Sequence, residues 1–242
     1  MIRTIAIVMA MHDEAAPVVS ALGATPVAAP AGRPHQWYLA QRAGARVVIS
    51  VNGADRRFGV EGVGPEPAVM NTVATIERFL PDLVVSAGTA GGWAARGASI
   101  GKVYLSYPHV VRHDRRIAIE GYQEYGEGRF PVVPMRAVAA DIGAELGVVT
   151  TGGSLDETAE DIAIMATLDA RAKEMEAASV AWVCETLQVP FVALKTITDL
   201  ADAHATAADQ FLENLHTASA QLTEHLVLFV DRVAGRSVDE LD

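Results

Sequence analysis

Short apolar runs rich in β-branched residues recur along the chain and predict the strands of a sheet. The runs are nearly continuous rather than alternating, which indicates strands covered on both faces. Between them, apolar residues follow the three-and-four spacing of amphipathic helices. The alternation predicts an α/β fold, a three-layer αβα sandwich with a mixed central β-sheet. The clearest runs are residues 5–8, 47–51, 83–87, 102–106 and 191–197.

Three segments have clear helical periodicity. Segment 67–79 starts with a proline, which suits a first helical turn, and another proline follows its end. Segment 177–187 keeps an apolar stripe until Pro190 ends it. A long last helix carries one apolar face from Phe211 to Val233, and Thr206 is placed to cap it.

The chain has no internal repeat and no low-complexity linker, so we expect one domain over residues 1–242. A chain of 242 residues is long enough to bury a core without disulfides or metals. The Ala/Pro/Gly-rich stretch 24–34 predicts a hairpin connection or a surface loop. The polar segment 235–242 predicts a frayed tail.

The composition excludes several classes of protein. Half of the residues are hydrophobic and only 20% are charged, which excludes a disordered chain. The formal net charge of −11 argues against nucleic-acid binding, which needs a basic surface. Apolar stretches of about eight residues are far shorter than the roughly 20 that a membrane-spanning helix needs. With the single cysteine, Cys184, these totals predict a cytoplasmic protein.

Three carboxylates follow or precede strands at positions that could share one crevice. Glu14 follows the first run, Asp199 ends the last one, and Glu176 starts the helix before it. Sites in open α/β sheets form at the carboxyl ends of the strands, so these three could meet there. Each also has a structural alternative: Glu14 in a first helical turn, Glu176 on a solvated helix face, Asp199 as a helix N-cap.

Other motifs carry weaker signals. The glycine-rich turn 88–92 matches neither the dinucleotide fingerprint nor the P-loop. His113 and Asp114 could be read as a catalytic pair, but adjacent residues of a strand face opposite ways. The remaining histidines have no metal-ligand spacing. We therefore expect no metal and no cofactor.

Several motifs in a fixed order resemble one enzyme family. Met175-Glu176 is followed 23 residues later by Asp199, after the glycine-rich turn 88–92 and Glu14 at their expected places. Over residues 5–229 the chain resembles the methylthioadenosine and S-adenosylhomocysteine nucleosidases of the nucleoside phosphorylase superfamily. The segments 113–116, 125–126 and 151–156 resemble the plant-type branch. The resemblance implies a nucleoside phosphorylase-like fold.

The resemblance also implies a role for each matching residue. Glu14 would be the general base that activates water, Glu176 would bind the ribose hydroxyls, and Asp199 would protonate purine N7. The other matching positions form the expected substrate site: Thr89 and Lys195 around the attacking water, Met175 and Met11 at the substrate, Thr198 orienting Asp199, and Leu155 against the base.

The expected reaction is hydrolysis of 5′-methylthioadenosine to release adenine, with S-adenosylhomocysteine as a further substrate. A phosphorylase needs arginines near the end of the first strand, where this chain has Met11-His12-Asp13-Glu14. Two carboxylates there would repel phosphate. Arg56 or Arg57 could still supply positive charge, so a purine nucleoside phosphorylase stays an alternative. Hydrolysis of another purine nucleoside, such as futalosine, and non-catalytic nucleoside binding are the others.

The resemblance implies a homodimer whose partner chain completes the pocket for the 5′ substituent. Segments 109–126 and 205–211 are expected to shape that pocket. Within the second segment, Ala207 or Ala208 is expected where many bacterial enzymes have a phenylalanine.

Overall fold

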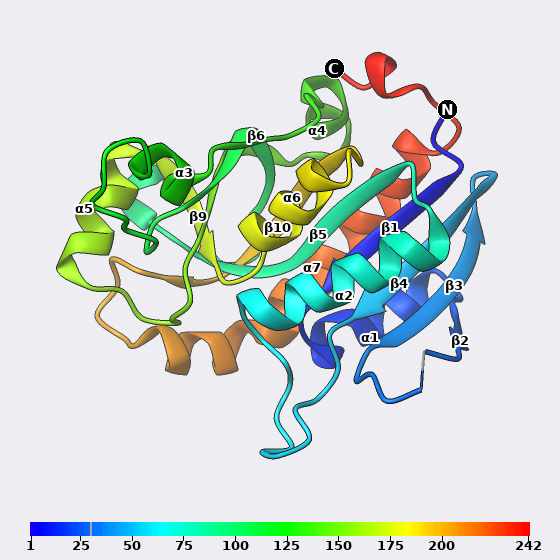
Figure 1. Cartoon of the computed structure of the whole chain (residues 1–242), viewed down its shortest axis with the longest axis horizontal. Coiled ribbons are helices and arrows are strands. Elements are labelled where there is room, and N and C mark those ends of the chain that lie inside the picture. Colours follow the sequence, from blue (N-terminus) through cyan, green and yellow to red (C-terminus); the bar gives the residue numbers. More distant parts are fainter. Residues whose placement is uncertain (30) are drawn as a thin grey trace.

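A mixed β-sheet forms the middle of the protein, and helices cover both of its faces (Figure 1). The computed structural model describes residues 1–29 and 31–242, and in these the sheet has ten strands. The strand order is β10-β6-β8-β9-β5-β1-β4-β3-β2, with β7 on β6 and a further pairing of β10 with β5. The strands are β1 (Thr4–Met9), β2 (Thr25–Val27), β3 (Gln36–Arg42), β4 (Ala45–Val51), β5 (Leu83–Gly92), β6 (Val103–Arg112), β7 (Phe130–Pro131), β8 (Glu145–Thr151), β9 (Ala170–Glu174) and β10 (Phe191–Leu200).

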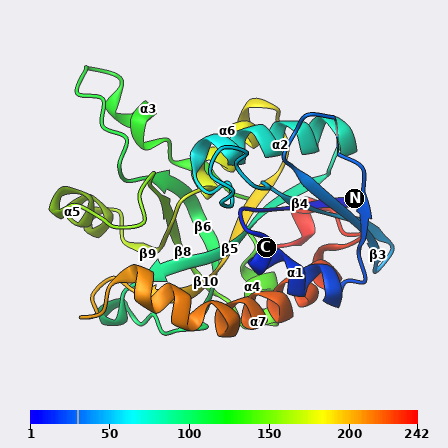
Figure 2. The same ribbon diagram turned by 90° about the horizontal axis from the view of Figure 1, so that it is seen from below.

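The helices form the two outer layers, which gives the predicted αβα sandwich (Figure 2). On one face, α2 (Pro65–Phe79) and α6 (Ala177–Thr186) pack on a core of buried residues that includes Val8, Val84 and Phe191. The other face carries α1 (His12–Ala21), α4 (Arg136–Ile142) and α7 (Ala207–Val233), over a separate core. Two further helices, α3 (Gln123–Glu127) and α5 (Ala159–Thr167), lie beyond one side of the sheet. None of the helices in the described part of the chain is long and apolar enough to cross a membrane.

The predicted strands and helices match the structure closely. Four of the five apolar runs lie wholly in strands; the fifth, 102–106, begins one residue before β6, at Lys102, and the strand extends further than predicted, to Arg112. The helix predicted from residue 67 begins two residues earlier, at Pro65. The Thr206 hydroxyl caps α7 by accepting a hydrogen bond from the Asp209 amide at 3.1 Å, as predicted. Asp199 is not a helix N-cap, because it lies inside β10.

Parallel pairing brings the ends of three distant strands to one edge of the sheet. β1 pairs with β5, and β5 pairs with β10, both in parallel register. The register shifts between Ile197 and Asp199, which marks a β-bulge opposite Ala90 and Gly91. A bulge changes the direction of side chains at the end of a strand. The loop after β1, the glycine-rich end of β5 and the bulge of β10 therefore meet at this edge.

The C-terminal segment 235–242 packs against the domain, so the prediction of a frayed tail is wrong. The amide of Ile2 donates to the carbonyl of Arg236, and the amide of Gly235 donates to the carbonyl of Ile2. Val238–Glu240 form a short 3-10 helix, and Leu241 is fully buried in the core beneath α4 and α7. The segment is mostly polar, and its one buried apolar side chain, Leu241, was not recognised from the sequence. In the stretch 24–34, β2 contributes a short edge strand, and Pro30 lies outside the described residues.

If Leu241 anchors the C-terminal segment, Leu241→Ala will lower the free energy of unfolding by about 2–5 kcal/mol, because it removes a fully buried side chain. Leu212→Ala is the matched control, since Leu212 is 75% exposed on α7, and its effect should stay within about 0.5 kcal/mol. Chemical denaturation measures both. Equal effects of the two substitutions would contradict the anchoring of the tail.

Candidate active site

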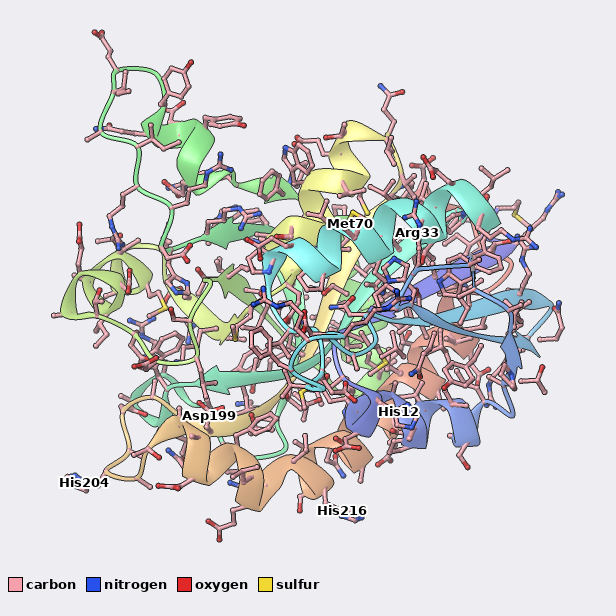
Figure 3. The ribbon with its side chains drawn as sticks, turned by 60° about the horizontal axis from the view of Figure 1, so that its bottom comes forward. His12, Arg33, Met70, Asp199, His204 and His216 are labelled. Atoms are coloured by element: carbon pink, nitrogen blue, oxygen red, sulfur yellow. The ribbon has the colours of Figure 1, made fainter. Side chains whose placement is uncertain are left out.

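A cavity of about 310 Å³ opens at the edge of the sheet where β1, β5 and β10 end. Figure 3 labels Asp199 there, beside the first turns of α7, and His12 at the start of α1. Most of the exposed surface of the wall is apolar, although charged and hydroxyl side chains also line it. The lining residues from these strand ends and the loops after them are Ala10, Met11, Glu14, Ala87, Gly88, Thr89, Ala90, Gly91, Thr198 and Asp199. The remaining wall consists of Val63, His113, Ser154, Leu155, Lys173, Glu174, Met175, Glu176 and Phe211.

Glu14 lies in the first turn of α1, with its side chain buried against the end of β5. One carboxylate oxygen accepts the Thr89 amide at 2.8 Å and the Thr89 hydroxyl at 2.5 Å. A Cβ atom at Gly88 would approach the other oxygen to 3.1 Å, so glycine makes room for this carboxylate. Burial raises the pKa of Glu14, against the lowering effect of the Thr89 hydrogen bonds.

Glu176 occupies the N-cap position of α6, where its side chain reaches across to the loop after β4. Its carboxylate accepts the Gly64 amide at 2.7 Å. Burial, together with the neighbouring Glu174, raises the pKa of Glu176 to about 7. Near neutral pH this group therefore changes between its protonated and ionised forms.

Glu174 and Lys195 form an ion pair directly behind this site. The Lys195 ammonium lies 2.9 Å from a Glu174 oxygen, and both side chains are almost completely buried. Glu174 also accepts the amides of Glu176 and Ala177, so it caps the first turn of α6. Despite burial, the Glu174 and Glu176 charges raise the pKa of Lys195.

Asp199 stands on the bulge of β10 and is 2% exposed. Its Oδ1 atom lies 2.9 Å from the Thr198 hydroxyl, whereas its Oδ2 atom has no protein partner in the described structure. A Cβ atom at Gly91 would lie 2.6 Å from that Oδ2 atom, so the β5 backbone passes close beneath the carboxyl group. Burial raises the pKa of Asp199. A protonated Asp199 would have one proton free to donate into the cavity.

Lys173 closes the wall beside Asp199. Its ammonium donates to the Leu155 carbonyl at 2.7 Å and forms an ion pair with Glu157. Both side chains of this pair are largely buried. These contacts hold the loop that carries Leu155 against β9. The Glu157 carboxylate neutralises the charge of the Lys173 ammonium.

The structure brings eight of the nine residues predicted from the family pattern to one cavity: Met11, Glu14, Thr89, Leu155, Met175, Glu176, Thr198 and Asp199. Lys195 is the exception, because it lies behind the wall and contacts Glu174. In the predicted segment 205–211, the cavity is lined by Phe211 and not by Ala207 or Ala208. Glu14 does lie in a first helical turn, but it is buried rather than solvated.

His113 and Asp114 do not form a catalytic pair. The His113 ring lies 3.1 Å from the Thr150 hydroxyl, and Asp114 accepts the Gly153 amide. His113 therefore contacts β8 itself, and Asp114 holds the segment after it. Within residues 1–29 and 31–242 no group of three or more His, Cys, Asp and Glu side chains is arranged to hold a metal ion.

Sequence reasoning missed Glu174, Lys173 and Glu157. A charged pair such as Lys173-Glu174 is usually solvent-exposed, so nothing in the sequence marked these side chains as buried. The only available signal was the place of Lys173 and Glu174 directly before Met175-Glu176, and Glu157 had none.

Comparisons with known proteins match this fold and site. The phosphorylase superfamily profile covers residues 4–231. The chain is 34% identical to the 5′-methylthioadenosine nucleosidase of Arabidopsis thaliana, over 99% of this chain and 91% of that protein. It is also 34% identical to the 5′-methylthioadenosine/S-adenosylhomocysteine nucleosidase of the same plant, over 99% and 95% of the two chains.

Solved structures of nucleosidases share the fold of this chain. The apo structure of Arabidopsis thaliana 5′-methylthioadenosine nucleosidase superposes with a TM-score of 0.96, at 34% identity and 99% coverage of both chains. The Neisseria meningitidis 5′-methylthioadenosine/S-adenosylhomocysteine nucleosidase, solved with methylthio-immucillin-A, gives 0.79 at 25% identity, over 96% of this chain and 100% of that one. The Helicobacter pylori futalosine hydrolase, at 21% identity, shares the fold, with a TM-score of 0.78 over 96% of this chain and 99% of that one.

The fold and the cavity define an enzyme of the phosphorylase superfamily, and more narrowly a nucleosidase, which hydrolyses N-glycosidic bonds. The chain belongs to the 5′-methylthioadenosine/S-adenosylhomocysteine nucleosidase family, and its plant members are among its relatives.

The raised pKa of Glu176 predicts how stability depends on pH. Because the folded-state pKa is above the unfolded value, the folded state binds this proton more tightly, and the stability gained is lost as pH rises through about 7. Relative to wild type, Glu176→Gln should therefore gain about 1–3 kcal/mol between about pH 5 and pH 8. Thermal or chemical unfolding across this range measures the difference.

Glu185→Gln is the matched control, since Glu185 is exposed on the same helix. For Glu185→Gln, the stability difference from wild type should not change with pH. A constant difference for Glu176→Gln as well would contradict the raised pKa of Glu176.

Proposed function

We propose that this enzyme hydrolyses 5′-methylthioadenosine and releases adenine, with Asp199 as general acid, Glu14 as general base and Glu176 on the ribose hydroxyls. The observation that carries the proposal is the meeting of these three buried carboxyl groups in one largely apolar cavity. The names of the Arabidopsis relatives support the substrate.

Asp199 suits the leaving group. Breaking an N-glycosidic bond leaves negative charge on the purine, and a positioned acid lowers the barrier by protonating it. The raised pKa of Asp199 and its unpartnered Oδ2 atom support this role. The hydrogen bond from Thr198 to Oδ1 restricts the rotation of the Asp199 carboxyl group, which leaves Oδ2 for the purine.

Glu14 suits the attack on the sugar. In an inverting hydrolysis a second carboxylate activates a water molecule on the face opposite the leaving group. The two Thr89 hydrogen bonds to Glu14 hold one of its oxygens and leave the other for that water. The negative charge of Glu176 stabilises the positive charge that builds on the ribose ring as the bond breaks.

Hydrolysis is favoured over phosphorolysis by the charge of the cavity wall. Neither Arg56 nor Arg57 is among its lining residues, and Glu157 balances the cation of Lys173. A phosphate dianion would face Glu14 and Glu176, and every lysine near them is already paired with a glutamate. The repulsion between phosphate and these carboxylates costs several kcal/mol in a poorly solvated site. A carboxylate at this position is what water activation requires.

The apolar side chains of Met11, Val63 and Phe211 in the wall suit a thioether substituent at the 5′ position. A methylthio group gains from such a surface, whereas the charged homocysteine of S-adenosylhomocysteine needs an exit to solvent. We therefore rank 5′-methylthioadenosine first and S-adenosylhomocysteine second. When Asp199 gives its proton to N7 through one oxygen, its other oxygen can only accept a hydrogen bond, so a 6-amino group suits the site better than the 6-oxygen of futalosine or inosine.

The purified enzyme should release adenine from 5′-methylthioadenosine at the same rate with and without phosphate, and the other product should be the free sugar. Asp199→Asn should reduce kcat by about 10²–10⁴-fold, because it removes the proton donor. Parallel assays with S-adenosylhomocysteine, adenosine and inosine rank the substrates.

Asp202→Asn provides the matched control, since Asp202 lies three residues away and accepts the Ala94 and Ala95 amides outside the cavity. Phosphate-dependent formation of a sugar 1-phosphate would refute hydrolysis. Full turnover by Asp199→Asn would refute the role of the acid.

A second copy of the chain is proposed to complete the pocket for the 5′ substituent. Segment 53–64 supports this: Val63 lines the cavity while remaining partly exposed, and Phe58 in the same segment is 69% exposed. Exposed apolar side chains next to a ligand cavity in the sequence, as here in segment 53–64, are consistent with an interface. The homodimer is also what the family resemblance implies.

A dimeric enzyme should be found by light scattering, and Phe58→Glu should shift it toward monomers while raising KM for 5′-methylthioadenosine. Leu80→Glu is the matched control, because Leu80 is similarly exposed, at 76%, but follows α2 and does not line the cavity. A wild-type monomer with full activity would contradict this part of the proposal.

A further inference from the structure

Glu174 is the buried acidic side chain in this region to which the proposed mechanism gives no task. Its carboxylate makes contacts with three elements: the first turn of α6, Thr151 on β8 and Lys195 on β10. Both of its oxygens are occupied by donors from the protein. A carboxylate so fully engaged has no free oxygen for substrate, so it acts on its neighbours.

We propose that Glu174 is a positioning residue of the ribose-binding site: it keeps the Lys195 ammonium behind the cavity wall and pins the turn from which Glu176 reaches the ribose. This inference rests on the proposed role of Glu176. It assigns different roles to two glutamates two residues apart: Glu174 pairs with Lys195, and Glu176 is left to bind the sugar.

The first part of the argument is the helix turn. Glu174 accepts the Glu176 amide at 3.0 Å and the Ala177 amide at 2.8 Å, while Thr151 accepts the Ala178 amide at 2.8 Å. Three amides of the first turn of α6 are thereby satisfied without help from the Glu176 side chain. Glu176 occupies the N-cap position but makes no capping bond, so its carboxylate is free to extend to Gly64 and the cavity.

The second part is the cation. Lys195 faces Glu174, Glu176 and Glu14, and its ammonium is close enough to Glu174 for a direct ion pair, at 2.9 Å. A buried ammonium without a partner is costly, so without Glu174 it would turn to Glu176 or Glu14. Pairing with Glu176 would occupy the oxygens that the ribose hydroxyls need. The Glu174 pair prevents this while leaving a positive potential near Glu14 and Glu176.

Because of the charged groups around Glu176, substitutions of Glu174 and of Lys195 are expected to change the pKa of Glu176 in opposite directions. Glu174 and Glu14 raise its pKa, and Lys195 lowers it. Arg112 and His113, from β6 and the loop after it, also face Glu174, and the pKa of His113 is lowered by burial. Removing Glu174 eliminates a negative neighbour and releases Lys195, so both effects favour ionised Glu176. Removing Lys195 has the reverse effect.

The test is the pH dependence of kcat/KM for adenine release by wild type, Glu174→Gln, Lys195→Gln and the double variant. The acidic limb should move to lower pH by about one unit or more in Glu174→Gln, and to higher pH in Lys195→Gln. The double variant should lie between the two, because each group acts on Glu176 partly through the other. Glu185→Gln, exposed on the same helix, should leave the limb in place.

A purely structural role for Glu174 would lower kcat or stability without moving the limb, and that result would overturn the inference. If Glu174→Gln does not fold, the limb of Lys195→Gln decides alone: a shift to lower pH or no shift refutes the proposal. A wild type that releases no adenine would refute the proposed function instead. The pH dependence of unfolding would then still test the opposite shifts of Glu176 without turnover.

Discussion

The buried ion pair between Lys195 and Glu174 is the interaction around which the candidate active site is arranged. A buried ammonium is tolerated only with a close anionic partner, and loss of that partner costs about 3–5 kcal/mol. Here the partner comes from β9 and the cation from β10, two strands that are not neighbours in the sheet. The pair therefore ties together the two ends of the segment 174–195, which also includes Met175, Glu176 and α6.

The sheet supplies the geometry for this arrangement. β1, β5 and β10 run parallel, so residues after the first strand and at the ends of the other two reach one edge, although they are up to 185 positions apart in the chain (Glu14 and Asp199). Two glycines of β5 leave room for the carboxyl groups: Gly88 for Glu14 and Gly91 for Asp199. The backbone of β5 thus lies between Glu14 and Asp199, which suits their proposed roles as base and acid on opposite faces of a sugar.

The three carboxyl groups of the cavity differ in hydrogen bonding and pKa, which supports the different roles proposed for them. Glu14 has hydrogen bonds from Thr89 on one oxygen, Asp199 has an oxygen without a partner, and Glu176 has a pKa of about 7. Burial raises the pKa of all three, and the nearby cations, Lys195 and Lys173, oppose that effect. Both cations are themselves paired, so the cavity presents acids and bases but no free cation among its described lining residues.

The sequence by itself determined the α/β class, most strand and helix positions, and eight lining residues of the cavity. It could do so because apolar periodicity reports burial directly, and because the spacing from Met175-Glu176 to Asp199 is a strong family pattern. Only the tertiary structure decided that Lys195 lies behind the wall, that Phe211 rather than Ala207 or Ala208 lines the cavity, and that Leu241 anchors the C-terminus. It also revealed Glu174, Lys173 and Glu157 as buried partners. The physical reason is that a charged residue is buried only when a partner from elsewhere in the chain reaches it, and the identity of that partner depends on strand order and register, which local sequence does not encode.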